Sequence, residues 1–432
     1  MFEEELRREA VRRRMAGEGP EAIAEALGRT SRWVRKWVSR HEEAGQQEAW
    51  ASERSRAPLH SPSATPPEVV DQIISARQRL VANPRAQYGS LAIAWELRRL
   101  GVSPIPPART IERVLARAGL SRPRRRSPRY VSKGVAYPTP RAEPGSLHQI
   151  DLVGPRHLHG GVEFHALNLI DVGSHEAAND IVEVTRPSLL AVSLASMWTE
   201  VGLPATAQFD NHSNFRGGIP PAFQFFGPVV AMCLDLEVTP RFIPLREPWR
   251  NGVIEHFNDV WDKSFFRTEV FGGLAHLRTE NAAFVEFHNI HHRYAAHGGA
   301  SPVEIRHDRP RRALSSGYRP PTRLPAKGRI EVVRYVRSDR RLDLFGKRIL
   351  LAEDQTHQYV TAHIKVRSNE LVVVTLDSTA RSSMRAATPF PGRFADRFRN
   401  DLLTVPDLPR RNDVVTVVAL VNLRNDVLTV KS

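Results

Sequence analysis

The sequence predicts a multidomain protein, with helical modules first, an α/β core next and a small β-barrel near the C-terminus. Three observations support this order. With 432 residues, 41% of them hydrophobic, the chain has room for about two to four domains with real cores. Apolar residues recur at helical spacing up to about residue 120, and strand and helix patterns alternate from 147 to 306. From residue 327 the apolar period is two, which is typical of strands.

Residues 1–50 are expected to form a helix-turn-helix domain. Gly28 ends a short second helix, and Thr30 or Ser31 caps a third, whose apolar residues form one stripe. A helix, a turn and a helix with a basic face is the plan of domains that place the second helix in the DNA major groove. A plain three-helix bundle with a charged surface is the alternative. The basic residues expected to contact DNA are Arg32, Arg35, Lys36 and Arg40.

A second helical DNA-binding module is expected at 66–120, after a linker rich in Ser, Pro and Ala. Capping residues and helix breakers place its helices at 66–82, 90–100 and 107–118. Between residues 51 and 150 there are 17 Arg or Lys against 6 Asp or Glu. Because neutralising phosphates releases counterions, this local excess favours DNA as the ligand.

Residues 121–146 form a basic, proline-broken linker. Arg124, Arg125 and Arg126 lie in it and are candidate DNA contacts. A tether along the phosphate backbone and a solvated charged linker explain this composition equally well.

The composition as a whole favours a polyanionic partner. The formal net charge is +15 and the isoelectric point is about 10.6, so nucleic acid is the first candidate. Cys233 is the only cysteine, which excludes an intramolecular disulfide and a multi-cysteine zinc site. The N-terminus does not resemble a signal sequence, and no run approaches the ~20 apolar residues of a membrane span. We therefore expect a cytoplasmic, nucleoid-associated bacterial protein with no membrane partner.

Three acidic residues stand out by their local setting. Asp151 and Asp210 each end an apolar run, and Glu255 lies where an amphipathic helix begins. Carboxylates are hard oxygen ligands that suit Mg²⁺ or Mn²⁺. Two such ions about 3.5 to 4 Å apart can activate a nucleophile and stabilise the leaving oxygen of a phosphodiester. Each acid taken singly is more often a solvated charge or a turn residue, so the three are candidates as an ordered set.

These motifs resemble the catalytic core of the DDE transposase and retroviral integrase superfamily. The resemblance covers about residues 145–304 and includes the stretch Trp-Arg-Asn-Gly-Val-Ile-Glu at 249–255. It implies a ribonuclease H-like core at 147–306 with a mixed five-stranded sheet. In that fold Asp151 lies on the first strand, Asp210 after the fourth and Glu255 on a helix.

Two features depart from the family's pattern. His212 stands where glycine commonly follows the Asp-Asn pair, and the interval from Asp210 to Glu255 is long. Residues 213–229 are therefore interpreted as an inserted loop.

The resemblance implies a DNA transposase that uses Asp151, Asp210 and Glu255 as catalytic residues and ligands of two Mg²⁺ or Mn²⁺ ions. Such an enzyme cuts the ends of its element and joins them to target DNA, acting as a homo-oligomer on DNA. Lys263, on a later turn of the Glu255 helix, is a further candidate DNA contact. The paired helical modules are similar to the N-terminal helix-turn-helix domains of bacterial insertion-sequence transposases. A catalytically inactive DNA-binding descendant and a nuclease that cuts without joining are the alternatives, and the need for a helper ATPase stays open.

The C-terminal part is expected to contain a small β-barrel at 327–378 and a tail at 379–432. The barrel resembles those that follow the core in several integrase-like transposases. The tail repeats an Arg-Asn-Asp motif, starting at Arg399, Arg411 and Arg424. Either three strands with Asn-Asp turns or translated DNA repeats at the end of the element explain this pattern.

Overall fold

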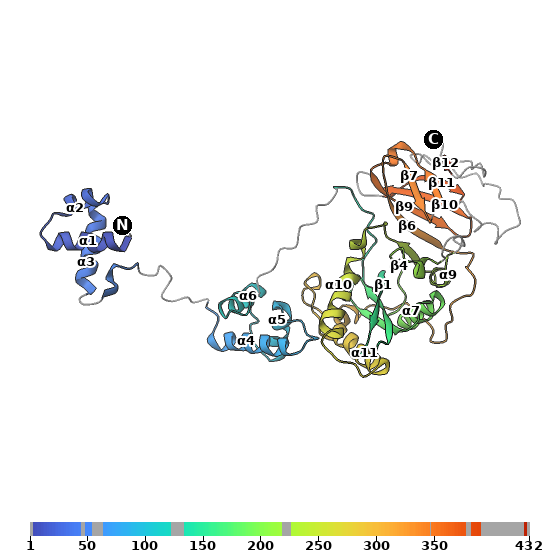
Figure 1. The fold of residues 1–432 in the computed structure, drawn as a ribbon, viewed down its shortest axis with the longest axis horizontal. Helices are drawn as coiled ribbons and strands as arrows, with labels where there is room; N and C mark the ends of the chain where they lie inside the picture. The colour runs from blue at the N-terminus through green and yellow to red at the C-terminus, as the bar shows by residue number, and fades with distance from the viewer. Residues whose placement is uncertain are drawn as a thin grey trace. The chain divides into compact units, whose positions relative to one another are not determined.

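The computed structural model divides the chain into two compact units, Met1–Pro66 and Pro67–Ser432 (Figure 1). In the described part of the first unit, Gly28 ends the second of three α-helices in a left-handed conformation with φ 64°. The Thr30 hydroxyl accepts a hydrogen bond from Trp33 N at 3.2 Å, as expected of a cap. The residues that the structure describes are 3–44, 48–53, 64–121, 134–217, 226–345, 347–376, 382–389 and 427–429. The helices of the first unit are α1 (Glu3–Met15), α2 (Pro20–Leu27), α3 (Ser31–Ala44) and the 3₁₀ turn η1 (Glu48–Ala51).

The second unit begins with three helices that pack around a small apolar core. They are α4 (Pro67–Ala82), α5 (Ser90–Arg99) and α6 (Ala108–Arg117). Ile73, Ile93 and Ile111, one from each helix, are fully buried against one another. These helices lie within two residues of the predicted ones, because Pro67, Gly101 and Gly119 mark their ends.

A mixed sheet forms the centre of the second unit. The antiparallel strands are β1 (Leu147–His157), β2 (Glu163–Asp171) and β3 (Ala177–Val182), and β4 (Thr206–Phe209) and β5 (Thr239–Phe242) run parallel to β1. The spatial order β3-β2-β1-β4-β5 is that of the ribonuclease H-like fold. The predicted fold of the core is therefore confirmed.

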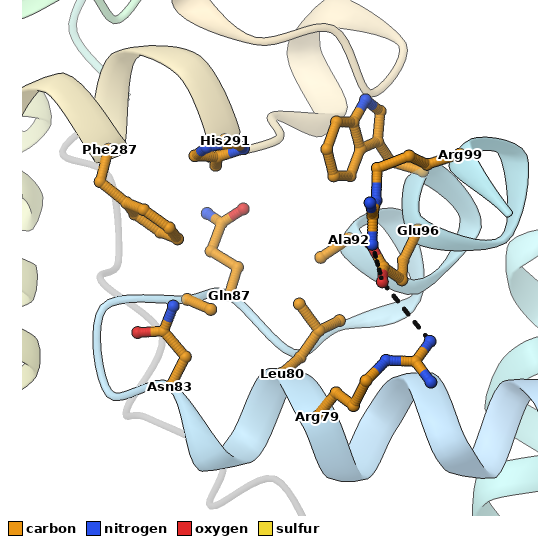
Figure 2. A pocket seen from close by; sticks show the side chains of 11 residues that line it. Arg79, Leu80, Asn83, Gln87, Ala92, Glu96, Arg99, Phe287 and His291 are labelled. Carbon is orange, nitrogen blue, oxygen red and sulfur yellow. Dashed lines mark hydrogen bonds and ion pairs between the residues drawn. The ribbon is translucent and has the colours of Figure 1, made fainter.

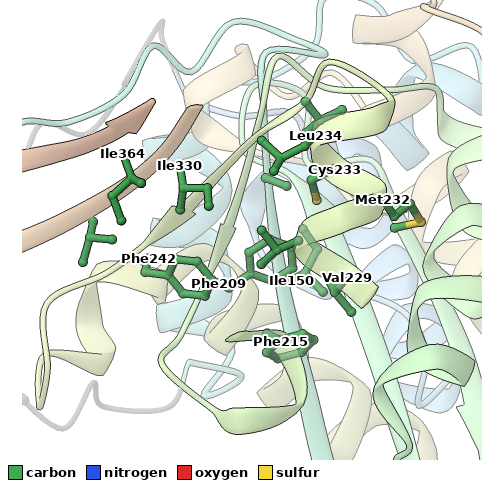
Figure 3. Close-up of a cluster of buried hydrophobic side chains, with 14 of the residues drawn as sticks. Ile150, Phe209, Phe215, Val229, Met232, Cys233, Leu234, Phe242, Ile330 and Ile364 are labelled. Atoms are coloured by element: carbon green, nitrogen blue, oxygen red, sulfur yellow. The ribbon is translucent and has the colours of Figure 1, made fainter. Parts of the chain in front are cut away.

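Helices cover both faces of this sheet, as the alternation of side chains along β2 requires. Leu167 and Leu169 face α7 (Pro187–Val201) and α9 (Pro228–Asp235), in the cluster shown in part in Figure 3. Ala166 and Ile170 face the opposite side, against α10 (Gly252–Trp261) and α11 (Leu274–His291). The remaining short helical elements are α8 (Ser213–Arg216), η2 (Pro248–Asn251), the π-helical turn η3 (Asp262–Phe266), η4 (Ala295–His297), α12 (Pro302–Arg306) and η5 (Glu353–Gln355).

The C-terminal strands differ from the prediction of a separate barrel. They form as expected, but β6 pairs in parallel with β5, so the core sheet has nine strands within the described residues instead of five. Ile330 and Val332 of β6 share one buried cluster with Phe242 of β5, which explains why the edge of β5 is covered. Closure into a barrel is not confirmed. The added strands are β6 (Arg329–Val336), β9 (Gln358–Lys365), β10 (Glu370–Leu376) and β11 (Ser382–Pro389).

A second, three-stranded sheet lies beside them, made of β7 (Arg341–Leu344), β8 (Lys347–Leu350) and β12 (Val427–Thr429). Strand β12 belongs to the third tail repeat and pairs in parallel with β8. The first two repeats lie outside the described residues. Among the described helices none is both long and apolar enough to cross a membrane.

Candidate active site

The sheet brings two of the predicted carboxylates to equivalent positions on neighbouring strands. Strands β1 and β4 are parallel, with Gln149 opposite Gln208. Asp151 and Asp210 each follow two residues later, Asp151 within β1 and Asp210 directly after β4. Glu255 lies in the first turn of α10, which packs on β1 and β2. The three predicted residues therefore come from three adjacent elements.

The charges of these carboxylates act on one another. Burial and the nearby charge of Asp210 raise the pKa of Asp151 above its ordinary value. Glu255 is exposed, and partial desolvation together with the charge of Asp151 raises its pKa. Acids that repel each other in this way form a donor set whose repulsion a divalent cation would relieve. Among the described residues, however, no three His, Cys, Asp or Glu side chains are grouped closely enough to hold a metal ion.

Two glutamines tie the segment before Glu255 to the strands that carry the aspartates. The Gln149 and Gln208 side chains both donate to the carbonyl oxygen of Arg250, at 3.3 and 3.0 Å. Gln149 Oε1 also accepts from Ile254 N at 3.0 Å, which satisfies one of the free N–H groups at the start of α10. Sequence reasoning missed these two residues, although a Gln-x-Asp pattern in both strands places them on the same face as the aspartates.

His212 closes the turn that follows Asp210. Its N–H donates to Asp210 Oδ1 at 2.9 Å, and its Nδ1 accepts from Asn214 N at 3.3 Å. Asp210 therefore has the turn geometry that an Asp-Asn pair favours. The predicted insertion after it contains helix α8 and the start of α9, and its residues 218–225 lie outside the described chain.

The C-terminal strands reach the same turn through Arg334 of β6. Its guanidinium donates to Asn211 Oδ1 at 2.8 Å and to the carbonyl oxygen of Ile243 at 3.0 Å. Asn211 donates in turn to that carbonyl at 2.7 Å. Burial lowers the pKa of Arg334 to about 10. Asn211, which follows Asp210, is thus hydrogen-bonded to strand β6, about 120 positions later in the chain.

Arg250, just before α10, is enclosed by two tyrosines. Its guanidinium carbon lies 3.7 Å from the centre of the Tyr137 ring and 5.0 Å from that of Tyr359. It also pairs with Glu247 at 3.1 Å and donates to the Tyr359 hydroxyl at 3.0 Å. The C-terminal part of the basic linker, which carries Tyr137, and strand β9 therefore both support the start of the Glu255 helix.

The predicted DNA contacts fall into three groups. On α3, Arg32, Arg35 and Lys36 are exposed, whereas Arg40 is partly buried with its guanidinium carbon 4.8 Å from the Trp37 ring centre. Lys263 is exposed and pairs with Asp259 at 2.5 Å. The three linker arginines, Arg124, Arg125 and Arg126, lie outside the described residues.

A cavity of about 330 Å³ lies between α4, α5 and the end of α11 (Figure 2). Phe287 and His291 line one side, and Arg79 and Arg99 both pair with Glu96 on another. Beside it, Arg85 pairs with both Glu269 and Glu280 at 2.6 Å. Of these pairs, Arg85–Glu280 links the second helical module to α11.

Comparison with known protein families finds a similarity in the N-terminal unit. A family model described as a homeodomain-like domain matches residues 2–50. The N-terminal unit is thus similar to a homeodomain-like domain, and a core with the strand order of the ribonuclease H-like fold follows it. No curated protein sequence matches it.

Two similar solved structures come from viral integration machinery. One is the simian T-cell lymphotropic virus intasome in complex with PP2A regulatory subunit B56 gamma, at 12% identity and a TM-score of 0.33, covering 68% of this chain and 91% of that one. The other is the catalytic core domain of BIV integrase, at 15% identity and a TM-score of 0.29, covering 37% and 93%. Because both TM-scores are low, the fold of the core rests on its strand order.

Proposed function

We propose that this protein is a DNA transposase whose catalytic residues are Asp151, Asp210 and Glu255. The observation that carries this proposal is that the three acids come from adjacent elements, with the charge of Asp210 raising the pKa of Asp151 and the charge of Asp151 raising the pKa of Glu255. Acidic side chains with a structural role in a folded core are normally paired with bases. Carboxylates whose pKa is raised by a neighbouring carboxylate are typical of functional sites. The homeodomain-like unit supports DNA as the substrate.

The three carboxylates would hold two Mg²⁺ or Mn²⁺ ions, which supply nucleophile activation and stabilisation of the leaving oxygen. The chain's own residues position the substrate and the carboxylates. Gln149 and Gln208 fix the start of α10, and the basic face of α3 binds the DNA of the element. In the first reaction water attacks a phosphodiester and frees a 3′-hydroxyl. In the second that hydroxyl attacks a target phosphodiester, and a target 3′-hydroxyl leaves.

A DNA-binding protein descended from such an enzyme is the second candidate. His212 favours it, since a side chain stands where the family commonly has glycine. His212 nevertheless completes the Asp210 turn with two hydrogen bonds, so the substitution is compatible with a formed site.

The test is strand transfer by the full chain in Mg²⁺ or Mn²⁺, with labelled duplexes taken from the DNA on either side of the gene. Joined products are expected, and Asp210→Asn and Glu255→Gln should abolish them while gel-shift binding persists. Asp259→Asn is the matched control, because Asp259 is an exposed acid one turn later on the same helix. Joining by Glu255→Gln at the wild-type rate would overturn the catalytic assignment, and binding without joining by the wild type would establish the second candidate.

A further inference from the structure

A continuous row of side-chain hydrogen bonds runs through the core and ends on Asp151. It begins at the indole N–H of Trp261, which donates to Asn281 Oδ1 at 2.8 Å. Asn281 donates to Asn179 Oδ1 at 2.7 Å, and Asn179 donates to Asn168 Oδ1. The row continues from Asn168 Nδ2 to Asn258 Oδ1 at 2.6 Å, and from Asn258 Nδ2 to Asp151 Oδ2 at 2.7 Å. We call these residues the asparagine chain: Trp261, Asn281, Asn179, Asn168 and Asn258.

The chemistry of the two ends fixes the direction of the asparagine chain. The Trp261 indole can only donate, so Asn281 must present its oxygen to it. An ionised Asp151 can only accept, so Asn258 must present its amide nitrogen. Each amide between the ends accepts through its oxygen and donates through its nitrogen, and both ends impose the same order. All five donors therefore point along the row toward the carboxylate, an arrangement in which each bond polarises the next.

The asparagine chain lies between the sheet and its covering helices. Asn168 and Asn179 are opposite each other on β2 and β3, and Asn168 is also opposite Asp151 on β1. Asn258 and Trp261 belong to α10, and Asn281 belongs to α11. Asn168, Asn281 and Trp261 are buried, with exposed fractions of 0%, 3% and 0%. A buried amide costs free energy unless it is hydrogen-bonded. Here each amide bonds the next, in a layer between sheet and helices that is otherwise filled by apolar side chains.

We propose that the asparagine chain is a positioning network for Asp151, in which Asn258 fixes the direction of the carboxylate and the other members fix Asn258. The inference rests on the proposed function, since it assigns Asp151 the task of holding a cation. A metal-binding carboxylate needs one oxygen anchored so that the other keeps a constant aim, and an amide donor on the neighbouring helix supplies that anchor. Asn258 lies one turn after Glu255 on α10, so the same helix carries one candidate ligand and orients another.

The first experiment measures Mn²⁺ affinity of the full-length protein by electron paramagnetic resonance of free Mn²⁺. Asn258→Ala should weaken affinity about 10-fold or more, the usual effect of removing a partner that orients a ligand. Trp261→Phe, which keeps a ring and removes the terminal donor, should weaken it less. The matched control is Asn289→Ala, because Asn289 also lies on α11 and bonds both the N–H and the carbonyl of Ala177 at 2.8 Å, outside the asparagine chain. It should lower the unfolding midpoint and leave Mn²⁺ affinity unchanged. Wild-type affinity in folded Asn258→Ala, or equal weakening in Asn289→Ala, would overturn the proposal.

The second experiment needs no metal and separates this inference from the proposed function. Thermal unfolding midpoints are compared for Asp151→Ala, which removes the acceptor of the Asn258 amide, for Asn258→Ala and for the double variant. If the two side chains act as one row, the shifts of the single variants do not add, because the second change removes a bond that the first has already broken. Additive shifts would overturn the asparagine chain. A wild-type protein that binds no Mn²⁺ but shows non-additive shifts would instead overturn the proposed metal-dependent function and leave the orientation of Asp151 by Asn258 supported.

Discussion

Gln149 and Gln208 are register partners on β1 and β4, and both donate to one acceptor, the carbonyl oxygen of Arg250. Each lies two residues before one of the candidate aspartates. The strands that carry the aspartates therefore also anchor the segment that leads into the third carboxylate's helix. This arrangement sets the distance between strand ends and helix by hydrogen bonds to the backbone, which few substitutions could replace.

Gln149→Leu should destabilise the protein and reduce joining by more than the smaller folded fraction explains. The change keeps the bulk of the side chain but leaves the Arg250 carbonyl with one donor fewer and Ile254 N without its acceptor. The lost hydrogen bond to the carbonyl, which keeps Gln208, costs about 0.5–1.5 kcal/mol and the unsatisfied Ile254 N–H about 1–3 kcal/mol, so we expect a decrease of roughly 2–4 kcal/mol in the free energy of unfolding in urea. Gln358→Leu is the control, since Gln358 donates to the Asp354 carbonyl at 2.6 Å far along the chain from the acids. A Gln149 variant as stable and active as the control would refute the anchoring role.

Asp151→Asn should stabilise the metal-free protein while removing any stabilisation by Mn²⁺. The native pKa of Asp151 is raised by burial and by Asp210, so its ionised form disfavours the folded state at neutral pH. A gain on the order of 0.5–2 kcal/mol is typical when a functional but destabilising group is removed. Calorimetric midpoints of both proteins, with and without Mn²⁺, measure this.

The pH dependence of that gain has a definite sign. Because the folded pKa lies above the unfolded one, the native wild type binds a proton more tightly, and its relative stability rises as pH falls through the folded pKa. The advantage of Asp151→Asn should therefore be full near pH 7 and shrink toward pH 4. An advantage that grows on acidification would contradict the raised pKa.

Arg334→Met should damage the site although Arg334 lies outside the core predicted from the sequence. The substitution leaves Asn211 Oδ1 and the Ile243 carbonyl each with one donor fewer, and hydrogen bonds from charged groups contribute about 1.5–3 kcal/mol. We expect lower stability in urea and reduced joining, because Asn211 follows Asp210 directly. The exposed Arg341→Met, in the neighbouring strand β7, serves as the control. Equal behaviour of the two variants would argue against a link between β6 and the turn.

Lys36→Ala on α3 should weaken DNA binding of the full chain to all sequences alike if Lys36 binds phosphate. Removing one lysine–phosphate interaction reduces the slope of log affinity against log salt by about 1, which fluorescence anisotropy at several salt concentrations measures. Arg12→Ala is the matched control, an exposed basic residue on α1 that pairs with Glu9. An unchanged slope for Lys36→Ala would remove it from the DNA interface.

Local signals explain what the sequence could predict. Three predicted helices end just before Gly28, Gly101 and Gly119, where the backbone adopts a positive φ. Alternating apolar residues predicted the strands, and the acids at strand ends predicted the candidate site. Helix α9 was missed because the Gly- and Pro-rich run before Pro228 resembles a loop.

Which strands pair with each other could not be predicted from the local sequence pattern when the strands are far apart in the chain. The pattern at 329–335 predicted a strand but not that it would pair with β5. Periodicity fixes which residues face inward, whereas the neighbour of a strand depends on residues far away in the chain. The asparagine chain was invisible for the same reason, since its members come from four elements and only their assembly gives them a common direction.

The pairing of β6 with β5 has a practical consequence for fragment design. A truncated protein ending at residue 306, the natural choice from the motifs alone, would leave the edge of β5 uncovered and strip Asn211 of its guanidinium donor. Uncovered edges invite strand-to-strand aggregation, so such a fragment should precipitate. A fragment that extends through Leu376 keeps β6, β9 and β10 in place and is the shorter version to crystallise.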